Sequence, residues 1–162
     1  MFAAVFSGRR LALTLVAFGL AGALVATQAP PSAQAATTQA ASVISWSKNQ
    51  LGKPWALGAI GMRKFDCSGL VYRTFYETGL IKKIGGTRRT AKGYWDWFRN
   101  RGLASRSNPK KGDLIVWGKG RHIGIYIGDG KAISALSTGV KVHGVFALTS
   151  TFTAYLHVDI SR

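Results

Sequence analysis

The sequence predicts a domain of the α+β class, with helices in its first half and an antiparallel β-sheet in its second half. Three observations support this prediction. Apolar residues recur at helical spacing as far as about residue 102, and after Pro109 they form short runs or alternate with small residues. In addition, the dipeptide Asp129-Gly130 between two apolar segments is a strong signal for a hairpin turn.

Helices are expected in three segments of the first half. Residues 42–51 carry apolar residues at helical spacing and are followed by a glycine. A second helix is expected to begin near Asp66, which can cap its first turn, and to stop at Gly79. Thr90 can cap a third helix that ends at Gly102.

The second half is expected to form short strands connected by turns. They are predicted at residues 113–117, 122–127, 131–135, 140–145 and 154–160. Because consecutive strands are joined by short connections, we expect an antiparallel meander. The chain shows no internal repeat and no linker after residue 41, so residues 42–162 are expected to form one domain.

The first 35 residues have the features of a secretion signal peptide. Arg9 and Arg10 precede a mostly apolar run at residues 11–26, and Ala33-Gln34-Ala35 is a small-x-small cleavage motif. The run is shorter than the roughly 20 residues of a membrane-spanning helix, so we expect cleavage after Ala35 and no membrane span afterwards. Residues 36–41 are then a flexible lead-in, and the protein is secreted or associated with the cell wall.

The chain carries a large excess of positive charge, with 22 Lys and Arg against six Asp and Glu and a formal charge of +16. Such an excess favours an anionic partner, which could be nucleic acid, anionic lipid or an acidic wall polymer. Residues 82–111 mix basic and aromatic residues, as some single-strand nucleic-acid binders do. The export signal makes a wall polymer the more natural counter-charge, so nucleic acid is not the expected partner.

Cys67 is the single cysteine of the chain, so no internal disulfide can form. A cysteine at the N-terminus of a helix lies at the positive end of the helix dipole, which is expected to lower the pKa of the thiol and favour the nucleophilic thiolate. A nucleophile of this kind needs a base. The chain offers His122, His143 and His157, each in a predicted strand, and position alone favours His122 only slightly.

Three motifs, in their order and spacing, resemble the NlpC family of cell-wall cysteine peptidases. They are Phe65-Asp66-Cys67-Ser68-Gly69-Leu70-Val71, Pro109-Lys110-Lys111-Gly112-Asp113-Leu114 and His122-Ile123-Gly124-Ile125-Tyr126-Ile127-Gly128. The resemblance covers about residues 51–143. It implies a papain-like fold, in which the helix that carries Cys67 packs on the sheet that carries His122.

The resemblance also implies a reaction and a substrate. Cys67 would attack a peptide carbonyl, and His122 would take the thiol proton and later protonate the leaving amine. The substrates of such relatives are stem peptides of bacterial peptidoglycan, often cut between D-glutamate and the diamino acid. Asp66 and Ser68 match positions that help to hold the peptide end of the substrate.

Two positions depart from the pattern of the family. Ser134 stands where the family usually has a third polar residue, most often His. Trp55 stands where relatives usually have Tyr, and the resemblance implies that it contacts the substrate. A two-residue turn at Asp129-Gly130 would place Ser134 opposite Ile125 and on the wrong face from His122. A three-residue loop would restore the right face, so the role of Ser134 as orienting residue comes from the resemblance.

Other functions stay open from the sequence alone. The departures allow a degenerate member that binds wall peptides without cutting them, although Cys67 and His122 are both present. The same site could serve as an amidase, an acyltransferase or a toxin that acts on another substrate. One Cys and three separated His lack the spacing of a metal site, so we expect no metal and no cofactor, and a monomer.

Overall fold

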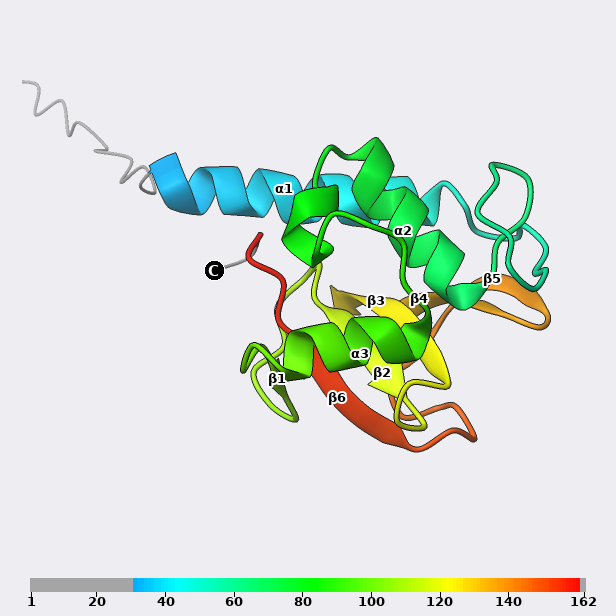
Figure 1. Cartoon of the computed structure of the whole chain (residues 1–162). Helices are drawn as coiled ribbons and strands as arrows, with labels where there is room; N and C mark the ends of the chain where they lie inside the picture. Colours follow the sequence, from blue (N-terminus) through cyan, green and yellow to red (C-terminus); the bar gives the residue numbers. More distant parts are fainter. Residues whose placement is uncertain (1–30, 161–162) are drawn as a thin grey trace, which may run out of the picture.

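The computed structural model of the chain describes residues 31–160, which form an antiparallel sheet packed against helices (Figure 1). This arrangement confirms the predicted α+β class. Residues 1–30, which make up most of the predicted signal peptide, lie outside the described residues. Between residues 31 and 160, no helix is both long and apolar enough to cross a membrane.

The first helix, α1 (Pro31–Lys48), begins well before residue 42. Residues 36–41, which were expected to form a flexible lead-in, are helical, and Ala40 is buried. This segment is rich in alanine, the residue with the highest helix propensity. Ala40 also packs beside Gly112, where an added Cβ would lie 3.6 Å from the Cα of Ala40. The structure therefore differs from the predicted lead-in, whereas cleavage after Ala35 stays a prediction.

The two following α-helices are capped as predicted. The helix α2 (Cys67–Glu77) is preceded by Asp66, whose carboxylate accepts a hydrogen bond from a first-turn amide. The helix α3 (Ala91–Arg99) is preceded by Thr90, whose hydroxyl does the same. Between them lies a 3-10 helix, η1 (Ile81–Ile84), which the sequence did not reveal because four residues are too few to show a period.

The sheet has six strands in the order β1-β6-β2-β3-β4-β5, all paired antiparallel. The predicted meander is correct for β2 to β5, but the last strand returns to pair with β2, where Leu114 lies opposite Leu156. Four of the five residues of that strand are buried, which a place at the free edge of the meander would not allow. The strands are β1 (Ala104–Ser105), β2 (Leu114–Trp117), β3 (His122–Gly128), β4 (Lys131–Leu136), β5 (Gly139–Gly144) and β6 (Phe152–Leu156).

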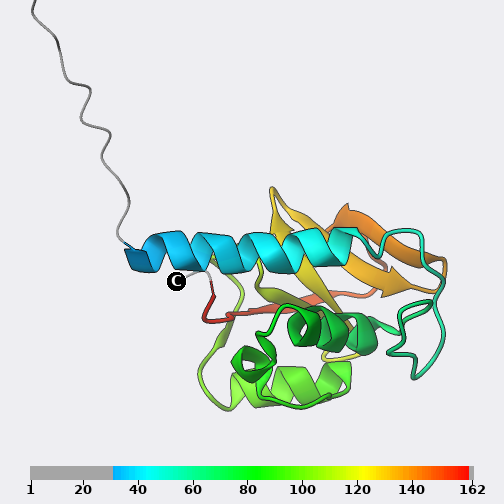
Figure 2. The same cartoon turned by 90° about the horizontal axis from the view of Figure 1, so that it is seen from above.

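The main core lies between one face of the sheet and the helices. Figure 2 shows α2 and α3 together on this side of the sheet. Each large apolar side chain that is fully buried here stabilises the fold by about 1.5–3 kcal/mol. The core includes Val71 and Phe75 of α2, Tyr94 and Phe98 of α3, and Leu114, Val116, Ile123, Ile125 and Leu156 of the sheet.

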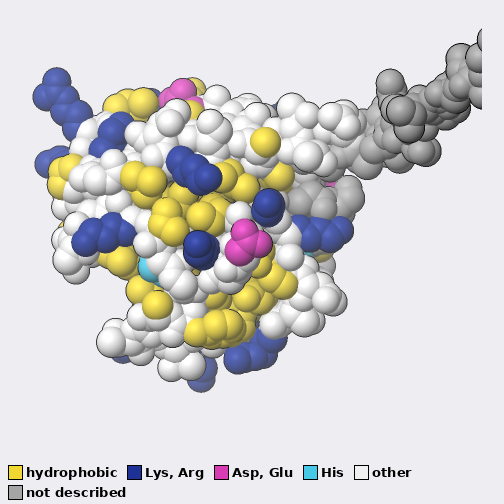
Figure 3. Space-filling view, turned by 180° about the vertical axis from the view of Figure 1, so that it is seen from behind, with side chains coloured by type: hydrophobic (Ala, Val, Ile, Leu, Met, Phe, Trp, Pro, Cys, Tyr) yellow, Lys and Arg dark blue, Asp and Glu magenta, His cyan; other side chains and the backbone are white. Residues whose placement is uncertain are grey.

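A second apolar cluster lies on the opposite face, around Trp117, Phe152 and Tyr155. The indole nitrogen of Trp117 donates a hydrogen bond of 2.7 Å to the carbonyl of Val145, which fastens the chain after β5 over this face. Seen from behind, hydrophobic side chains gather over the middle of the molecule between separate Lys and Arg side chains (Figure 3). Trp117 is fully buried, and its ring also supports the site described below.

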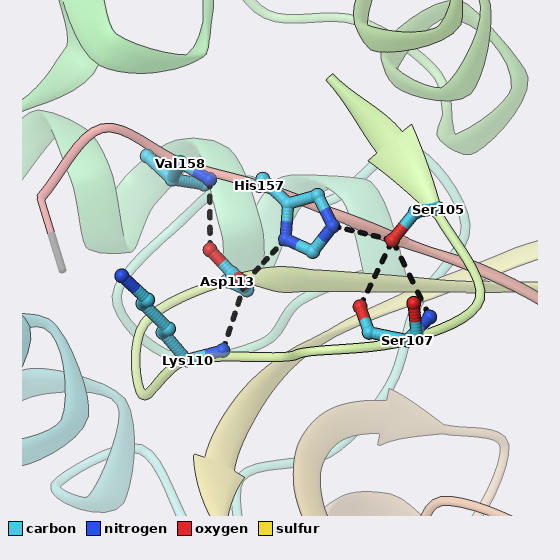
Figure 4. Close-up of polar contacts among 6 residues, drawn as sticks. All are labelled: Ser105, Ser107, Lys110, Asp113, His157 and Val158. Carbon is cyan, nitrogen blue, oxygen red and sulfur yellow. Dashed lines mark hydrogen bonds and ion pairs between the residues drawn. The ribbon is translucent and has the colours of Figure 1, made fainter. Parts of the chain in front are cut away.

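A polar cluster ties the segment after β6 to the start of β2 (Figure 4). The buried carboxylate of Asp113 lies 2.9 Å from Nδ1 of His157 and accepts the backbone amides of Lys110 and Val158 at 2.9 Å and 2.8 Å. The other ring nitrogen of His157, Nε2, lies 2.6 Å from Oγ of Ser105. This cluster draws the chain away from the sheet, so the last strand ends earlier than predicted.

Candidate active site

Cys67 is the first residue of α2, and two neighbours fix it there. Asp66 has an extended backbone (φ −88°, ψ 175°), and its Oδ1 accepts the amide of Gly69 at 2.5 Å, which starts the helix. Gly69 allows the preceding loop to pass close by, because a Cβ at this position would lie 2.0 Å from the carbonyl oxygen of Ala59. The thiol is therefore held at the helix N-terminus with the loop folded beside it.

A cleft of about 870 Å³ contains both Cys67 and His122, the first residue of β3. The backbone of Ile123, the next residue along β3, favours the thiolate of Cys67 and so limits the rise of its pKa. The structure thus brings together the nucleophile and the base that the sequence predicted, from elements 55 positions apart. The rest of the lining comes from Trp55, Leu57, Gly58, Asp66, Ser68, Arg88, Arg89, Thr90, Ala91, Gly120, Arg121, Ala135, Leu136, Ser137 and Thr138.

Ser134 of β4 lies on the same face of the sheet as His122, and its Oγ is 2.8 Å from Nε2 of the imidazole. The turn at Asp129-Gly130 has two residues, both with positive φ, as a tight hairpin requires. A β-bulge between Tyr126 and Gly128 then supplies the extra residue that corrects the register. The bulge, and not a three-residue loop, resolves the mismatch of faces expected from the sequence.

His143 of β5 joins this pair, a contact that the sequence analysis did not predict. Its Nε2 lies 2.7 Å from Oγ of Ser134, and its Nδ1 lies 3.0 Å from the carbonyl oxygen of Gly144. The ring of Trp117 packs against both imidazoles, with centroid distances of 5.4 Å to His122 and 5.5 Å to His143. Only knowledge of the pairing of β4 with β5 would have placed His143 here.

The two reacting groups are uncharged near neutral pH. Burial raises the pKa of the Cys67 thiol and outweighs the hydrogen bonds that the backbone gives it, while the charge of Asp66 raises it further. Burial lowers the pKa of His122 to about 4, and the nearby His143 lowers it too. The expectation of a lowered thiol pKa is therefore wrong, because desolvation of the thiolate exceeds the effect of the helix N-terminus.

Asp66 and Ser68 are locked together beneath the cleft surface. The hydroxyl of Ser68 donates to Oδ1 of Asp66 at 2.9 Å, and Arg88 holds Oδ2 at 2.7 Å. Both residues line the cleft as expected, but the carboxylate already has charged and neutral partners. Arg88, which the sequence analysis missed, thus stands beside the predicted binding residues. Its separation of 22 positions from Asp66 gives no sequence signal for this contact.

Trp55 is one of the residues that line the cleft. Its side chain is 39% exposed, and its backbone forms a bridge with Phe65, two residues before the nucleophile. Leu57 lies on the same loop and is 85% exposed. The loop therefore presents apolar surface next to Cys67, and contact of Trp55 with substrate stays a prediction.

The geometry suits nucleophilic attack on a carbonyl group assisted by a general base. A cysteine at a helix N-terminus and an imidazole that is hydrogen-bonded through Nε2 line the same cleft, and these are the two groups that cysteine hydrolases use. Within residues 31–160, no group of three or more His, Cys, Asp or Glu side chains is placed to hold a metal ion.

Comparisons with known proteins agree on one family. The sequence model of the NlpC/P60 family matches residues 52–158. Among curated proteins, the chain is 34% identical over 118 residues to "Murein DD-endopeptidase MepH" of Escherichia coli K12, covering 68% of this chain and 42% of that protein. It is 32% identical over 115 residues to "Probable endopeptidase p60" of Listeria grayi, covering 69% of this chain and 21% of that protein.

Solved structures share the fold. The NlpC/p60 domain of the peptidoglycan hydrolase SagA has a TM-score of 0.56 and 28% identity, covering 72% of this chain and 97% of that domain. The peptidoglycan hydrolase RipB of Mycobacterium tuberculosis has a TM-score of 0.59 and 25% identity, covering 80% of this chain and 71% of that structure. The chain spans only about a fifth to two fifths of the two curated relatives.

Proposed function

The chain belongs to the NlpC/P60 family, and on this basis we propose that it is a cysteine peptidase that hydrolyses peptide bonds in peptidoglycan stem peptides. The observation that carries the proposal is the placement of Cys67 at the start of α2 and of His122, hydrogen-bonded to Ser134, in the same cleft. The proposal extends the names of the relatives, "endopeptidase" and "peptidoglycan hydrolase", to this shorter chain.

The reaction starts from a neutral thiol and a neutral imidazole. As the sulfur of Cys67 bonds to the substrate carbonyl carbon, its proton passes to the ring nitrogen of His122 that does not face Ser134. The tetrahedral intermediate then loses its amine, which receives that proton, and a thioester remains. Water, with His122 again as base, cleaves the thioester to a carboxylic acid and restores the thiol.

The negative charge that develops on the substrate carbonyl oxygen also needs a hydrogen-bond donor. Backbone amides in the first turn of α2 do not all have partners within the helix, and the amide of Cys67 is one of these. This amide is therefore the first candidate to stabilise the oxyanion that forms on the carbonyl oxygen. A pair of neutral reactants makes this stabilisation important, because both charges appear only during the reaction.

The lining of the cleft favours an anionic substrate. Arg88, Arg89 and Arg121 line it, while its single carboxylate, Asp66, is already paired with Arg88. Stem peptides carry free carboxylates at D-glutamate and at the diamino acid, so the charges are complementary. We place the cut between these two residues, as the resemblance implies.

A second bond is favoured by one relative. The name of MepH specifies a DD-endopeptidase, which cuts a different peptide bond of the wall. That relative has 34% identity to this chain, so the D,D-cross-link is the alternative scissile bond.

The test is digestion of purified stem peptides and of cross-linked dimers with residues 36–162, beside the Cys67→Ala variant, followed by mass spectrometry. Release of fragments cut after D-glutamate by the native protein alone supports the proposal. Conversion of dimers to monomers would move the assignment to the cross-link. No cleavage of either substrate, with a thiol that also resists alkylation, would favour a wall-binding protein without activity.

Wall association is the second part of the proposal. A hollow of about 580 Å³ on the far side of Arg121 is also lined by Arg106 and Lys119, and no acidic residue lines it. None of these three cations forms an ion pair with another described residue. Because Arg121 lines both the hollow and the cleft, an anionic wall strand could run from one to the other.

Binding to purified sacculi tests this association. It should weaken between about 0.1 M and 1 M salt, as the Debye length falls from about 10 Å to about 3 Å, and it should weaken further when Lys119 is replaced by Gln. Association that is unchanged at high salt would contradict it. Secretion is proposed from residues 1–35, and an exported protein with Ala36 as its first residue is the expected finding.

A further inference from the structure

The imidazole of His122 stands at one end of a chain of hydrogen bonds that runs across three strands. From Nε2 of His122 on β3 the chain passes to Oγ of Ser134 on β4, at 2.8 Å, and on to Nε2 of His143 on β5, at 2.7 Å. It ends at the backbone carbonyl oxygen of Gly144, 3.0 Å from Nδ1 of His143. Ser134 is fully buried, so bulk water does not compete for its hydroxyl.

The carbonyl group of Gly144, at the end of this series of hydrogen bonds, determines the direction of every hydrogen bond in the series. A carbonyl oxygen can only accept, so Nδ1 of His143 carries the proton that is donated to Gly144. In the neutral ring, Nε2 of His143 is then an acceptor, and the hydroxyl of Ser134 donates to it. Oγ of Ser134 therefore accepts from Nε2–H of His122, which leaves Nδ1 of His122 without a proton.

We infer that His143 is a positioning residue for catalysis, which acts through Ser134 to hold His122 in the tautomer whose Nδ1 can accept the proton of Cys67. The inference rests on the proposed roles of Cys67 and His122. It also explains why Ser134 can occupy a position at which a serine alone would not suffice.

A serine without a further partner would not determine the tautomer. Its hydroxyl can rotate and either accept from or donate to the same nitrogen of His122. If it donated to Nε2, the proton of the ring would move to Nδ1, and the ring could no longer act as base toward the thiol. The acceptor on His143 prevents this rotation, because the hydroxyl proton is already engaged.

Packing around these hydrogen-bonded side chains keeps both imidazoles in place. Trp117 lies against both rings, and its own nitrogen is bonded to Val145. Gly124 on β3 admits Ser134 at close range, since a Cβ at Gly124 would lie 2.9 Å from the Cβ of Ser134. The titratable and charged groups near His122 are Cys67 at the start of α2, Asp66 just before it, Arg88, Arg89 and Arg121 on the cleft wall, and His143 on β5.

The test compares two replacements of His143. His143→Phe keeps a ring against Trp117 but offers no acceptor to Ser134, whereas His143→Gln can accept through its side-chain oxygen. We expect the Phe variant to lose about 10- to 100-fold in kcat with little change in KM, a part of the 10²–10⁴ that a positioned base contributes. The Gln variant should recover most of that loss. Val142→Ala, on the exposed side of the same strand, is the control.

Two readouts do not depend on the choice of substrate. The ¹⁵N shifts of the His122 ring should show a protonated Nε2 and an unprotonated Nδ1 in the native protein and in His143→Gln, and a mixture in His143→Phe. The rate of alkylation of Cys67 should fall in the same order. If wall peptides prove not to be substrates, these measurements still decide the role of His143.

Two results would contradict the positioning role of His143. An unchanged His122 tautomer and an unchanged alkylation rate in His143→Phe would overturn the inference. If that variant fails to fold, Ser134→Ala removes the middle of the chain and should give the same mixture of tautomers. A Ser134→Ala protein with native ring shifts and native kcat would also contradict the role.

Discussion

Between residues 31 and 160, two clusters join a histidine to a serine, and they differ in whether the histidine keeps a ring nitrogen without a hydrogen bond. In the cleft, His122 uses only Nε2, toward Ser134, and Nδ1 forms no hydrogen bond with any residue between 31 and 160. Near the C-terminus, His157 uses both nitrogens, one toward Asp113 and one toward Ser105. The second cluster has the residue types of a serine-hydrolase triad, but it is the first cluster in which a ring nitrogen is free to accept a proton.

The proton arrangement in the second cluster explains why it is structural. Oγ of Ser105 lies 2.9 Å from the carbonyl oxygen of Ser107, which can only accept, so the hydroxyl proton points there. Oγ must then accept from Nε2–H of His157, while Nδ1–H donates to Asp113. A ring with two donors is an ion-pair partner and cannot serve as a base. Residue types therefore do not identify a catalytic site, whereas an unused acceptor in a cleft does.

Removal of His122 should have the largest effect on activity. His122→Ala should reduce kcat/KM for stem peptides by about 10³-fold per folded molecule, within the range of a lost general base. His157→Gln is the matched control and should do the reverse, with lower stability and native activity per folded molecule. Activity of His122→Ala within tenfold of the native value would rule out its role as base.

Removal of Asp113 should be the largest effect on stability. Asp113→Ala leaves His157 partly buried without its counter-charge, and two backbone amides lose their acceptor. We expect the free energy of unfolding to fall by about 3–5 kcal/mol, the usual cost of removing one partner of a buried pair. Denaturant titration measures it, and a loss below about 1 kcal/mol would show that the cluster does not hold the C-terminal segment.

The pH dependence should expose the lowered pKa of His122. Its pKa of about 4 in the folded state lies below the ordinary value of 6.5. The unfolded chain therefore takes up a proton at this residue before the folded protein does, so its contribution to stability is complete above pH 6.5 and declines as the pH falls toward 4. The loss amounts to about 3 kcal/mol at most. The acid limb of kcat/KM should likewise lie near pH 4, and a limb near 6.5 would contradict burial of the ring.

Replacement of Arg88 should have a smaller effect, which we expect on substrate binding in the cleft. Arg88→Met removes the cation beside Asp66 while Asp66 keeps its bond to the helix amide. We expect KM for stem peptides to rise about tenfold, corresponding to about 1.4 kcal/mol for one charged hydrogen bond, with kcat retained. Arg99→Met, on the surface of α3, is the control. An unchanged KM would mean that Arg88 serves only to hold Asp66.

Much of the site could be predicted from local sequence, because local contacts build it. The caps Asp66 and Thr90 and the turn at Asp129-Gly130 depend on neighbours within a few residues, and all three are confirmed. The contacts of His143 with Ser134 and of Arg88 with Asp66 depend on strand pairing and chain crossing, which no local pattern encodes.

Two other outcomes required three-dimensional information. The last strand, β6, pairs with the edge of β2 that the meander β2 to β5 leaves unpaired. The alternation of apolar residues along the sequence does not show which edge β6 will choose. The raised pKa of Cys67 follows from the depth of burial, whereas the sequence showed only the helix N-terminus. In both cases the competing effect came from parts of the chain that are distant in sequence.

Covalent labelling tests the contrast between the two clusters most directly. The protein would be treated with electrophilic stem-peptide analogues, one selective for thiols and one for activated serines, and the modified residue located by tandem mass spectrometry. The account predicts an adduct on Cys67 alone, lost in His122→Ala and kept in His157→Gln. An adduct on Ser105, or labelling of Cys67 that does not depend on His122, would contradict it.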